Sequence, residues 1–217
     1  APHGDRLPTL GEEDAPPYYG MAIPYLMHGG ITERGTWRRK DPQQFRQLGI
    51  DLRHDRVKSV DAAARSLSFA SGGTLAFDNL LTATGSSPAL PRIPGIHAQR
   101  VHTCWTLDDA RAIAQFAVPG ARVIQLGAGF IGCIIMESLV RRRVQLTVVE
   151  MGDRMVPRMM GETAGGMIRD WVQAKGVAVH TGARIESIES GPADLAAPLA
   201  VRLSSGERLP ADLVISA

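Results

Sequence analysis

Three glycines and one glutamate have the types and the spacing of a dinucleotide-binding site. Gly127, Gly129 and Gly132 form the pattern G-x-G-x-x-G between an apolar strand and a helix, and Glu150 ends the next predicted strand. In this pattern the first glycine permits a tight turn, the second lets the backbone approach a pyrophosphate, and the third lets the helix pack on the sheet. The N–H groups at the helix N-terminus favour phosphate oxygens. The pattern therefore predicts an NAD(H) site; the alternative is a tight turn that binds no ligand.

Glu150 sets the expected preference between the two nicotinamide dinucleotides. A carboxylate at the end of the second strand accepts hydrogen bonds from the adenosine ribose hydroxyls, and it repels a 2′-phosphate. NADH is therefore favoured. NADPH remains the alternative, because Arg154 and Arg158 lie close to Glu150 in the sequence.

Other residue types that could do chemistry form no recognisable catalytic or metal site. The six histidines have no metal-ligand spacing, and no serine elbow, H-E-x-x-H motif or Walker loop occurs. Cys104 and Cys133 are too far apart for a C-x-x-C pair. Cys133 lies in the first turns of a predicted helix, where the dipole could lower the pKa of a thiol, but its apolar neighbours favour simple packing. We assign no catalytic side chain and no metal.

The composition excludes several classes of protein. Of the 217 residues, 44% are hydrophobic and 21% are charged, which is unlike a disordered chain. No apolar run approaches the roughly 18 residues that a membrane span needs, and no secretory signal is visible. The net charge is +2 with basic residues spread along the chain, so nothing indicates nucleic acid. Two cysteines fit a reducing compartment. We expect a cytoplasmic protein without membrane or nucleic-acid partners.

The predicted elements place the chain in the α/β class. Residues 1–40 are otherwise irregular and residues 85–105 are expected to be a linker, because both are rich in proline and glycine. A helix is expected to start at Thr106, which suits an N-cap. An antiparallel meander of three strands is expected over 184–210. The remaining expected helices are 23–27, 41–48, 129–142 and 161–174, and the remaining expected strands are 50–53, 57–60, 66–69, 74–77, 80–84, 123–126, 145–150, 177–180 and 213–217.

The two halves of the chain follow the same order of elements. Aligning Asp78 with Asp212 gives an offset of 134 residues (212 − 78), which moves the glycine loop to before residue 1. The same offset moves Glu150 to position 16, close to Glu12 and Glu13. We therefore predict a Rossmann-like NAD(H)-binding domain over 106–217 and a partial, related unit over 1–105 that lacks its first glycine loop. The alternative is that any two α/β segments look alike.

Four segments together resemble the FAD-dependent pyridine nucleotide-disulfide oxidoreductase superfamily. The likeness is greatest to its NAD(P)H-dependent flavin reductases, such as ferredoxin or rubredoxin reductases and the flavin-binding part of assimilatory nitrite reductases. The segments are GEEDAPPYYGMAIPYL, LLTATGSSPALPRIPG, GAGFIGCIIMESL with VVEMGDRMVPR, and LPADLVISA. They span nearly the whole chain in the order that the superfamily has.

The resemblance implies FAD as a second cofactor and assigns residues to both nucleotides. It makes 1–105 a partial FAD-binding domain. For FAD, the matching positions are Ala83, Thr84 and Gly85 against the flavin nucleotide, Val57 at the adenine, and either Glu12 or Glu13 at the ribose. For NAD(H), they are Gly127, Gly129, Gly132 and Glu150, with Ile131 beside the nicotinamide path and Ala217 near the pyrophosphate.

The implied function is FAD-dependent NAD(P)H oxidation, in which hydride passes from NADH to the flavin and electrons pass on to a small redox protein. Two departures from the superfamily matter. Ile134 stands where many members have a glutamate, and no cysteine precedes Cys104, which argues against disulfide chemistry in the FAD-binding domain. A disulfide reductase that uses Cys104 or Cys133 is a poor alternative, because it needs a thiol at the flavin and Cys133 lies in the NAD(H)-binding unit. The chain is also expected to be a fragment. The competing hypothesis is a non-catalytic NAD(H)-binding module that does not hold FAD.

Overall fold

The computed structural model describes residues 7–39, 41, 43–192 and 196–217. Contacts divide these residues into two compact units, one drawn from 1–19 and 37–86 and the other from 20–36 and 87–217. Segments 20–36 and 87–105 thus belong by contact to the unit that holds the glycine loop. The predicted boundary at residue 105 separates the expected FAD-binding and NAD(H)-binding domains, and this assignment stays a prediction.

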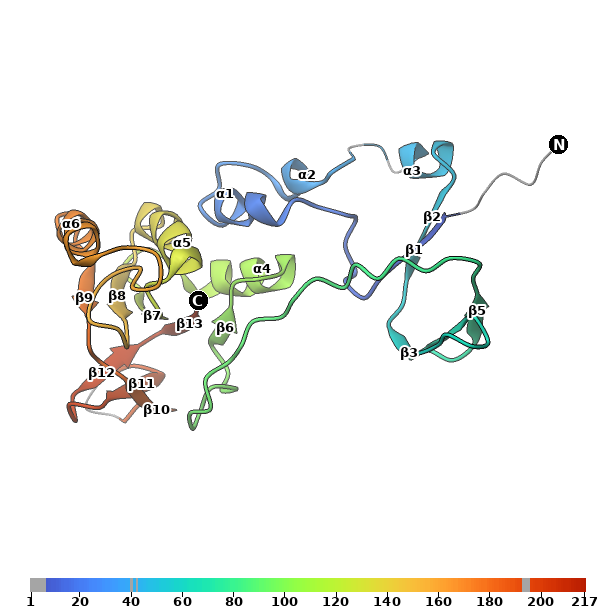
Figure 1. Ribbon diagram of the computed structural model, residues 1–217. Helices are drawn as coiled ribbons and strands as arrows, with labels where there is room; N and C mark the ends of the chain where they lie inside the picture. The colour runs from blue at the N-terminus through green and yellow to red at the C-terminus, as the bar shows by residue number, and fades with distance from the viewer. Residues whose placement is uncertain (1–6, 40, 42, 193–195) are drawn as a thin grey trace. The chain divides into compact units, whose positions relative to one another are not determined.

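The second unit is built on a parallel sheet of five strands (Figure 1). The strand order is β6 (Val101–Thr103), β13 (Leu213–Ser216), β7 (Arg122–Leu126), β8 (Gln145–Val149) and β9 (Ala178–His180). The chain runs outward from β7 to β9 and then returns with β13 to the other side of β7. This reversal produces a topological switch point between the carboxyl ends of β7 and β13, which is where open α/β sheets bind ligands.

Three helices cover one face of this sheet. Helix α4 (Leu107–Phe116) contacts β6 and β13, α5 (Phe130–Arg141) contacts β8, and α6 (Glu162–Gln173) contacts β9. In α5 the buried side chains recur at helical spacing, as a helix packed on a sheet requires. Thr106 caps α4 as predicted, because its side-chain oxygen accepts a hydrogen bond from Asp109 N at 3.1 Å.

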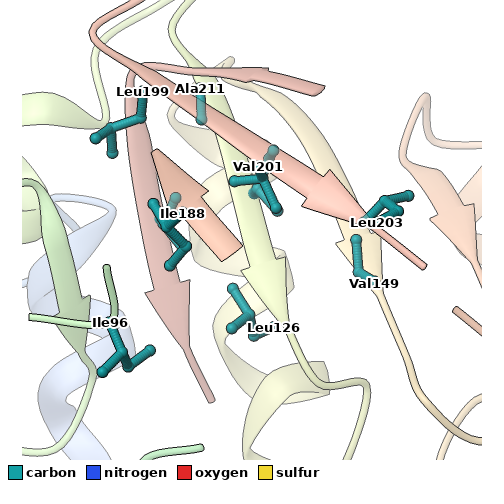
Figure 2. Packing of buried hydrophobic residues seen from close by; sticks show 10 residues of the cluster. Ile96, Leu126, Val149, Ile188, Leu199, Val201, Leu203 and Ala211 are labelled. Atoms are coloured by element: carbon teal, nitrogen blue, oxygen red, sulfur yellow. The ribbon is translucent and has the colours of Figure 1, made fainter. Parts of the chain in front are cut away.

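An antiparallel sheet covers the other face and closes the core. Its strands are β10 (Ile185–Ser190), β11 (Leu199–Leu203) and β12 (Arg208–Ala211), which confirms the predicted meander. Figure 2 shows Leu126 and Val149 of the parallel sheet facing the same apolar layer as Val201 and Leu203 of β11. The two sheets therefore share one core, with the glycine loop at its edge.

The first unit repeats part of this order. Strands β1 (Leu7–Gly11) and β2 (Ile50–His54) pair in parallel, and helix α3 (Gln43–Gln47) precedes β2. An antiparallel sheet follows, made of β3 (Val57–Asp61), β4 (Ser66–Phe69) and β5 (Thr74–Ala76). This matches β8, α6, β9 and the β10–β12 meander of the second unit, as the internal repeat predicts.

Segment 20–36 packs on the helices of the second unit. It forms η1 (Gly20–Ala22), α1 (Ile23–Met27) and α2 (Glu33–Thr36), of which α1 contacts both α4 and α5. The Arg142 guanidinium, just after α5, donates 2.6 Å hydrogen bonds to the carbonyls of Met27, Ala114 and Ala117. One side chain thus ties α1, the end of α4 and the end of α5 together.

Three predictions about elements were wrong. Leu80–Thr84, expected as a strand, is irregular and exposed, with Leu81 at 87% exposure. Conversely, β1 forms within the segment expected to be irregular, and β6 forms within the expected linker. The common reason is that a strand exists through its partners. Strand β6 pairs with β13 and β1 pairs with β2, whereas no described strand pairs with Leu80–Thr84.

Candidate functional site

The glycine loop lies at the switch point between β7 and β13. Gly127 directly follows β7 and has a φ of +93°, a conformation that residues with a Cβ rarely adopt. A Cβ at Gly127 would also lie 2.7 Å from the carbonyl oxygen of Ala217, just after β13. Both the turn and the neighbouring strand therefore require glycine here, and Ala217 lies beside the loop.

Gly132 is required by close packing. A Cβ at this position would lie 2.7 Å from Gln125 Nε2 and 2.7 Å from the carbonyl oxygen of Gly127. The first turn of α5 thus rests directly on the loop and on β7. This is the helix–sheet contact that the third glycine of the motif permits.

Gly129 differs from the other two glycines of the motif. Its φ is −73°, which any residue can adopt, and no other atom of the described residues lies within 4 Å of the position that a Cβ would occupy. It is the N-cap of α5 and provides no side-chain cap, while the first N–H groups of a helix have no intrahelical partners. The protein itself gives no reason for glycine here, whereas a phosphate group lying on the loop would.

Glu150 joins the loop to the segment after β8. Its Oε2 accepts a hydrogen bond from Ala128 N and its Oε1 accepts one from Gly152 N, both at 2.7 Å. The residue is only 8% exposed. Because an ionised carboxylate has about four acceptor sites, Glu150 keeps capacity for ribose hydroxyls after making these two bonds.

The two arginines considered for a 2′-phosphate differ in their surroundings. The Arg154 guanidinium donates to the carbonyls of Met160 and Pro157 and pairs with Asp153 at 2.7 Å. Its donors are therefore engaged within its own loop. Arg158 is exposed, so the NADPH alternative depends on Arg158 more than on Arg154.

A cavity of about 270 Å³ opens beside the loop. It lies where β6 and β13 end and where α5 begins, and its lining is mainly apolar. Ile131, predicted beside the nicotinamide path, forms part of its wall together with Trp105. The other lining residues are Ser87, Pro88, Ala89, Cys104, Ser216 and Ala217.

Neither cysteine is an activated thiol. Burial, with a smaller contribution from Asp109, raises the pKa of Cys104 to about 12, and its Sγ contacts Met27 Sδ at 3.4 Å. Burial also raises the pKa of Cys133, and the nearby Glu150 carboxylate adds to this rise. A catalytic thiolate needs a lowered pKa, so the surroundings of these two cysteines disfavour the thiolate.

The residues assigned to FAD lie in the first unit. Glu12 directly follows β1, with its Oε2 3.4 Å from Arg56 Nε, and Glu13 Oε2 accepts a 2.6 Å hydrogen bond from the Tyr18 hydroxyl. Both acids are exposed. Val57 begins β3 and is half-buried. Ala83, Thr84 and Gly85 form an exposed irregular segment, in which Gly85 has a φ of +67°.

One residue that supports the glycine loop was not predicted from the sequence. Gln125 lies in the middle of β7, is completely buried, and donates from Nε2 to the carbonyl oxygen of Gly127 at 2.8 Å. A single polar residue within the apolar run Val123–Leu126 was the signal that could have pointed to it.

Two findings concern sites of other kinds. Among the described residues, no group of three or more histidine, cysteine, aspartate or glutamate side chains is arranged to hold a metal ion. In the same part of the chain, no helix has the length and apolar character that crossing a membrane demands.

The parallel sheet, its switch point and the glycine loop define an α/β dinucleotide-binding protein. Residues 3–217 match the model of the pyridine nucleotide-disulphide oxidoreductase family, and the chain belongs to that family. The fold class and the resemblance predicted from the sequence are therefore confirmed.

Two curated relatives and one solved structure show what the chain is similar to. It is 30% identical over 201 residues to the NADH-dependent phenylglyoxylate dehydrogenase subunit epsilon of Aromatoleum evansii, covering 93% of this chain and 47% of the relative. It is 34% identical over 160 residues to the ferredoxin–NAD(+) reductase component of the biphenyl dioxygenase system of Paraburkholderia xenovorans strain LB400, covering 74% and 38%. The ferredoxin reductase for the CYP199A2 system from Rhodopseudomonas palustris superposes with a TM-score of 0.88 at 27% identity, covering 100% of this chain and 53% of that chain. The chain thus spans about half of these proteins or less.

Proposed function

We propose that this chain binds NADH at the glycine loop and contributes to an FAD-dependent NADH oxidoreductase that reduces a small iron–sulfur protein. The observation that carries the proposal is the open space at Gly129, at the N-terminus of α5, beside the buried carboxylate of Glu150. The relatives named above as NADH-dependent or as ferredoxin reductases support the reaction class. FAD, when bound, would supply the redox chemistry by accepting hydride and passing electrons on.

The chain's own residues bind and orient the dinucleotide. The first N–H groups of α5 would donate hydrogen bonds to the pyrophosphate, which would lie over Gly129. Glu150 would accept hydrogen bonds from the hydroxyls of the adenosine ribose. The nicotinamide half would run past Ile131 into the apolar cavity beside Trp105. The apolar wall of the cavity suits the flat aromatic ring of the nicotinamide. The guanidinium of Arg154 already donates to carbonyls of its own loop, and this favours NADH over NADPH.

For the FAD ribose, the internal repeat supports Glu12 over Glu13. Gly11 at the end of β1 pairs with His54 of β2, just as Val149 at the end of β8 pairs with His180 of β9. Glu12 therefore stands in the first unit where Glu150 stands in the second. Ala83, Thr84, Gly85 and Val57 remain the proposed contacts to the rest of FAD.

The decisive variant is Gly129→Val, with Gly166→Val as its matched control. Both glycines have open space at the Cβ position, so both variants should fold as the wild type does. Only Gly129→Val places methyl groups where the pyrophosphate would lie. We expect its Kd for NADH, measured by fluorescence titration, to rise at least about tenfold, while the control binds normally. Unchanged binding by Gly129→Val, or a wild-type chain that does not bind NADH, would contradict the proposal.

The second candidate is a NAD(H)-binding module that holds no FAD. The observation that favours it is the exposed, irregular state of Leu80–Gly85, in which the proposed flavin contacts lie. Visible absorption after gel filtration with FAD separates the two functions. A retained flavin band that bleaches with NADH supports the reductase, and a colourless protein that still binds NADH supports the module.

A further inference from the structure

Gln125 is a polar residue in a place that favours apolar ones. It lies in β7, a central strand of the parallel sheet, between the buried Ile124 and Leu126. Strands covered on both faces are usually continuous apolar runs. The Gln125 side chain is fully buried, and its Oε1 has no hydrogen-bond partner among the described residues. A buried acceptor without a partner lowers the stability of the fold.

Among the residues that the structure describes, the one hydrogen bond of the Gln125 amide is with the glycine loop. Nε2 donates to the carbonyl oxygen of Gly127 at 2.8 Å. A carbonyl oxygen can only accept, so the amide must present its NH₂ group there and leave Oε1 facing the core. The side chain thus holds Gly127 O in place while its own acceptor stays unsatisfied.

The opposite edge of the same peptide unit is held as well. The peptide that joins Gly127 to Ala128 carries the Gly127 carbonyl on one side and the Ala128 N–H on the other. Gln125 binds the carbonyl, and Glu150 Oε2 accepts from the N–H at 2.7 Å. Because Gly127 lacks a Cβ, its backbone has more freedom to rotate than any other residue would have. Two buried side chains, one in β7 and one just after β8, restrict that rotation.

We infer that Gln125 is a positioning residue for dinucleotide binding. It holds the Gly127–Ala128 peptide in the one orientation that aims the following N–H groups of α5 at the pyrophosphate. Groups held in their binding geometry before the ligand arrives do not have to be ordered on binding, and this strengthens affinity. The inference rests on the proposed NADH site and adds to it a residue of β7 that holds the glycine loop in place.

Replacing Gln125 by methionine separates positioning from packing. Methionine has a similar length, fills the same space, and removes both the hydrogen bond to Gly127 and the unsatisfied Oε1. We expect an equal or higher melting temperature together with a Kd for NADH raised about three- to tenfold, the size of one hydrogen bond. The matched control is Gln145→Met, which changes an exposed glutamine at the opposite end of the neighbouring strand β8.

The outcomes distinguish the inference from the proposed function. If the wild type binds NADH and Gln125→Met binds it equally well, the positioning role is wrong and the proposed function stands. A lowered melting temperature with unchanged Kd would show that Gln125 is structural only. A wild-type chain that binds no NADH would overturn both.

A measurement on the wild type covers the case in which Gln125→Met does not fold. The side-chain NH₂ of Gln125 should be protected from exchange with solvent, and its ¹⁵N signals should shift when NADH is added. Rapid exchange of this amide would overturn the inference, because the bond to Gly127 would then not be maintained in solution.

Discussion

At the scale of single residues, the structure requires two of the motif's three glycines, each for a different reason, and leaves the third unconstrained. Gly127 is set by its backbone conformation and by Ala217, and Gly132 is set by the packing of α5 on β7. Gly129 meets no constraint from the protein. A substitution therefore separates folding from binding at Gly129, while at the other two positions it disturbs both. The effect of each substitution follows from what occupies the place of the missing Cβ.

Glu150→Gln should weaken NADH binding and reduce discrimination against NADPH. The substitution places an NH₂ group against Ala128 N or Gly152 N, so one of the two hydrogen bonds is lost. It also removes the charge that would repel a 2′-phosphate. We expect a Kd for NADH that is about three- to tenfold higher and a smaller ratio of the two Kd values, measured by fluorescence titration with each dinucleotide. Glu207→Gln, at an exposed position, should change neither value, and an unchanged ratio in Glu150→Gln would exclude Glu150 as the ribose acid.

The turn at Gly127 and the close packing at Gly132 could be predicted from the sequence because their constraint is local. The motif, the preceding strand and the following helix are contiguous in the chain, so their roles follow from spacing alone. The contacts of Arg154 could not be predicted in the same way. They depend on the path of the loop back to Met160, which no periodic pattern encodes.

At the scale of elements, helix ends are fixed by nearby residues and strands by distant ones. The start of α4 shows the first case. Asp109 Oδ2 accepts hydrogen bonds from Thr103 Oγ1, Trp105 N and Thr106 N, all between 2.8 and 3.0 Å, while Thr106 caps Asp109 in return. The capping box was predictable from Thr106 onward. Strand β6, three residues earlier, was not, because its partner β13 lies more than a hundred residues away.

Asp109→Ala should destabilise the protein by about 2 kcal/mol, and Thr106→Ala by about 1 kcal/mol. The larger value reflects the three donors that Asp109 leaves without a partner. Asp108, the neighbouring acid, is 78% exposed and pairs with the exposed Arg111, so Asp108→Ala should cost a few tenths of a kcal/mol. Urea denaturation gives all three values. Equal losses for Asp108→Ala and Asp109→Ala would show that the box does not anchor α4.

Asp212→Asn should remove a pH-dependent part of the stability. Asp212, between β12 and β13, makes paired hydrogen bonds to the Arg122 guanidinium, and these hold the pKa of Asp212 below its usual value of 3.8. A lowered pKa in the folded state contributes stability above pH 3.8 that disappears as the pH falls through the lowered pKa. We expect the wild type to be more stable than Asp212→Asn by about 1 kcal/mol at pH 7, and the difference to shrink below pH 3.8. The midpoints of urea denaturation at pH 7 and at a pH below 3.8 test this expectation.

The control for this pair is Asp170→Asn, which removes an acid that is 70% exposed and pairs with its neighbour Arg169. Its midpoint should follow the wild type at both pH values. A difference between wild type and Asp212→Asn that persists undiminished in acid would mean that the ion pair is not its source.

At the scale of the whole molecule, the chain holds two versions of one plan that differ in how much they bury. Among the described residues, Leu67 is the one buried hydrophobic residue of the first unit, whereas the second unit has the core between its two sheets and further buried apolar side chains in α4 and α5. The repeat of elements was visible in the sequence. The packing of segment 20–36 on the second unit could not be predicted from the sequence, because it depends on contacts such as those of Arg142.

The two units should therefore differ in their protection from hydrogen exchange. Amides of β7, β8 and β13 lie inside a covered parallel sheet and should open only with global unfolding of their unit. Amides of β1 to β5 have little buried apolar surface above them and should exchange at least about a hundredfold faster, since local opening there costs less free energy. Mass spectrometry of peptides from each unit measures both rates in one experiment. Adding NADH should slow exchange around the glycine loop and leave β3–β5 unchanged. Equal protection of the two units without ligand would show that the first unit is stabilised by something other than its own core.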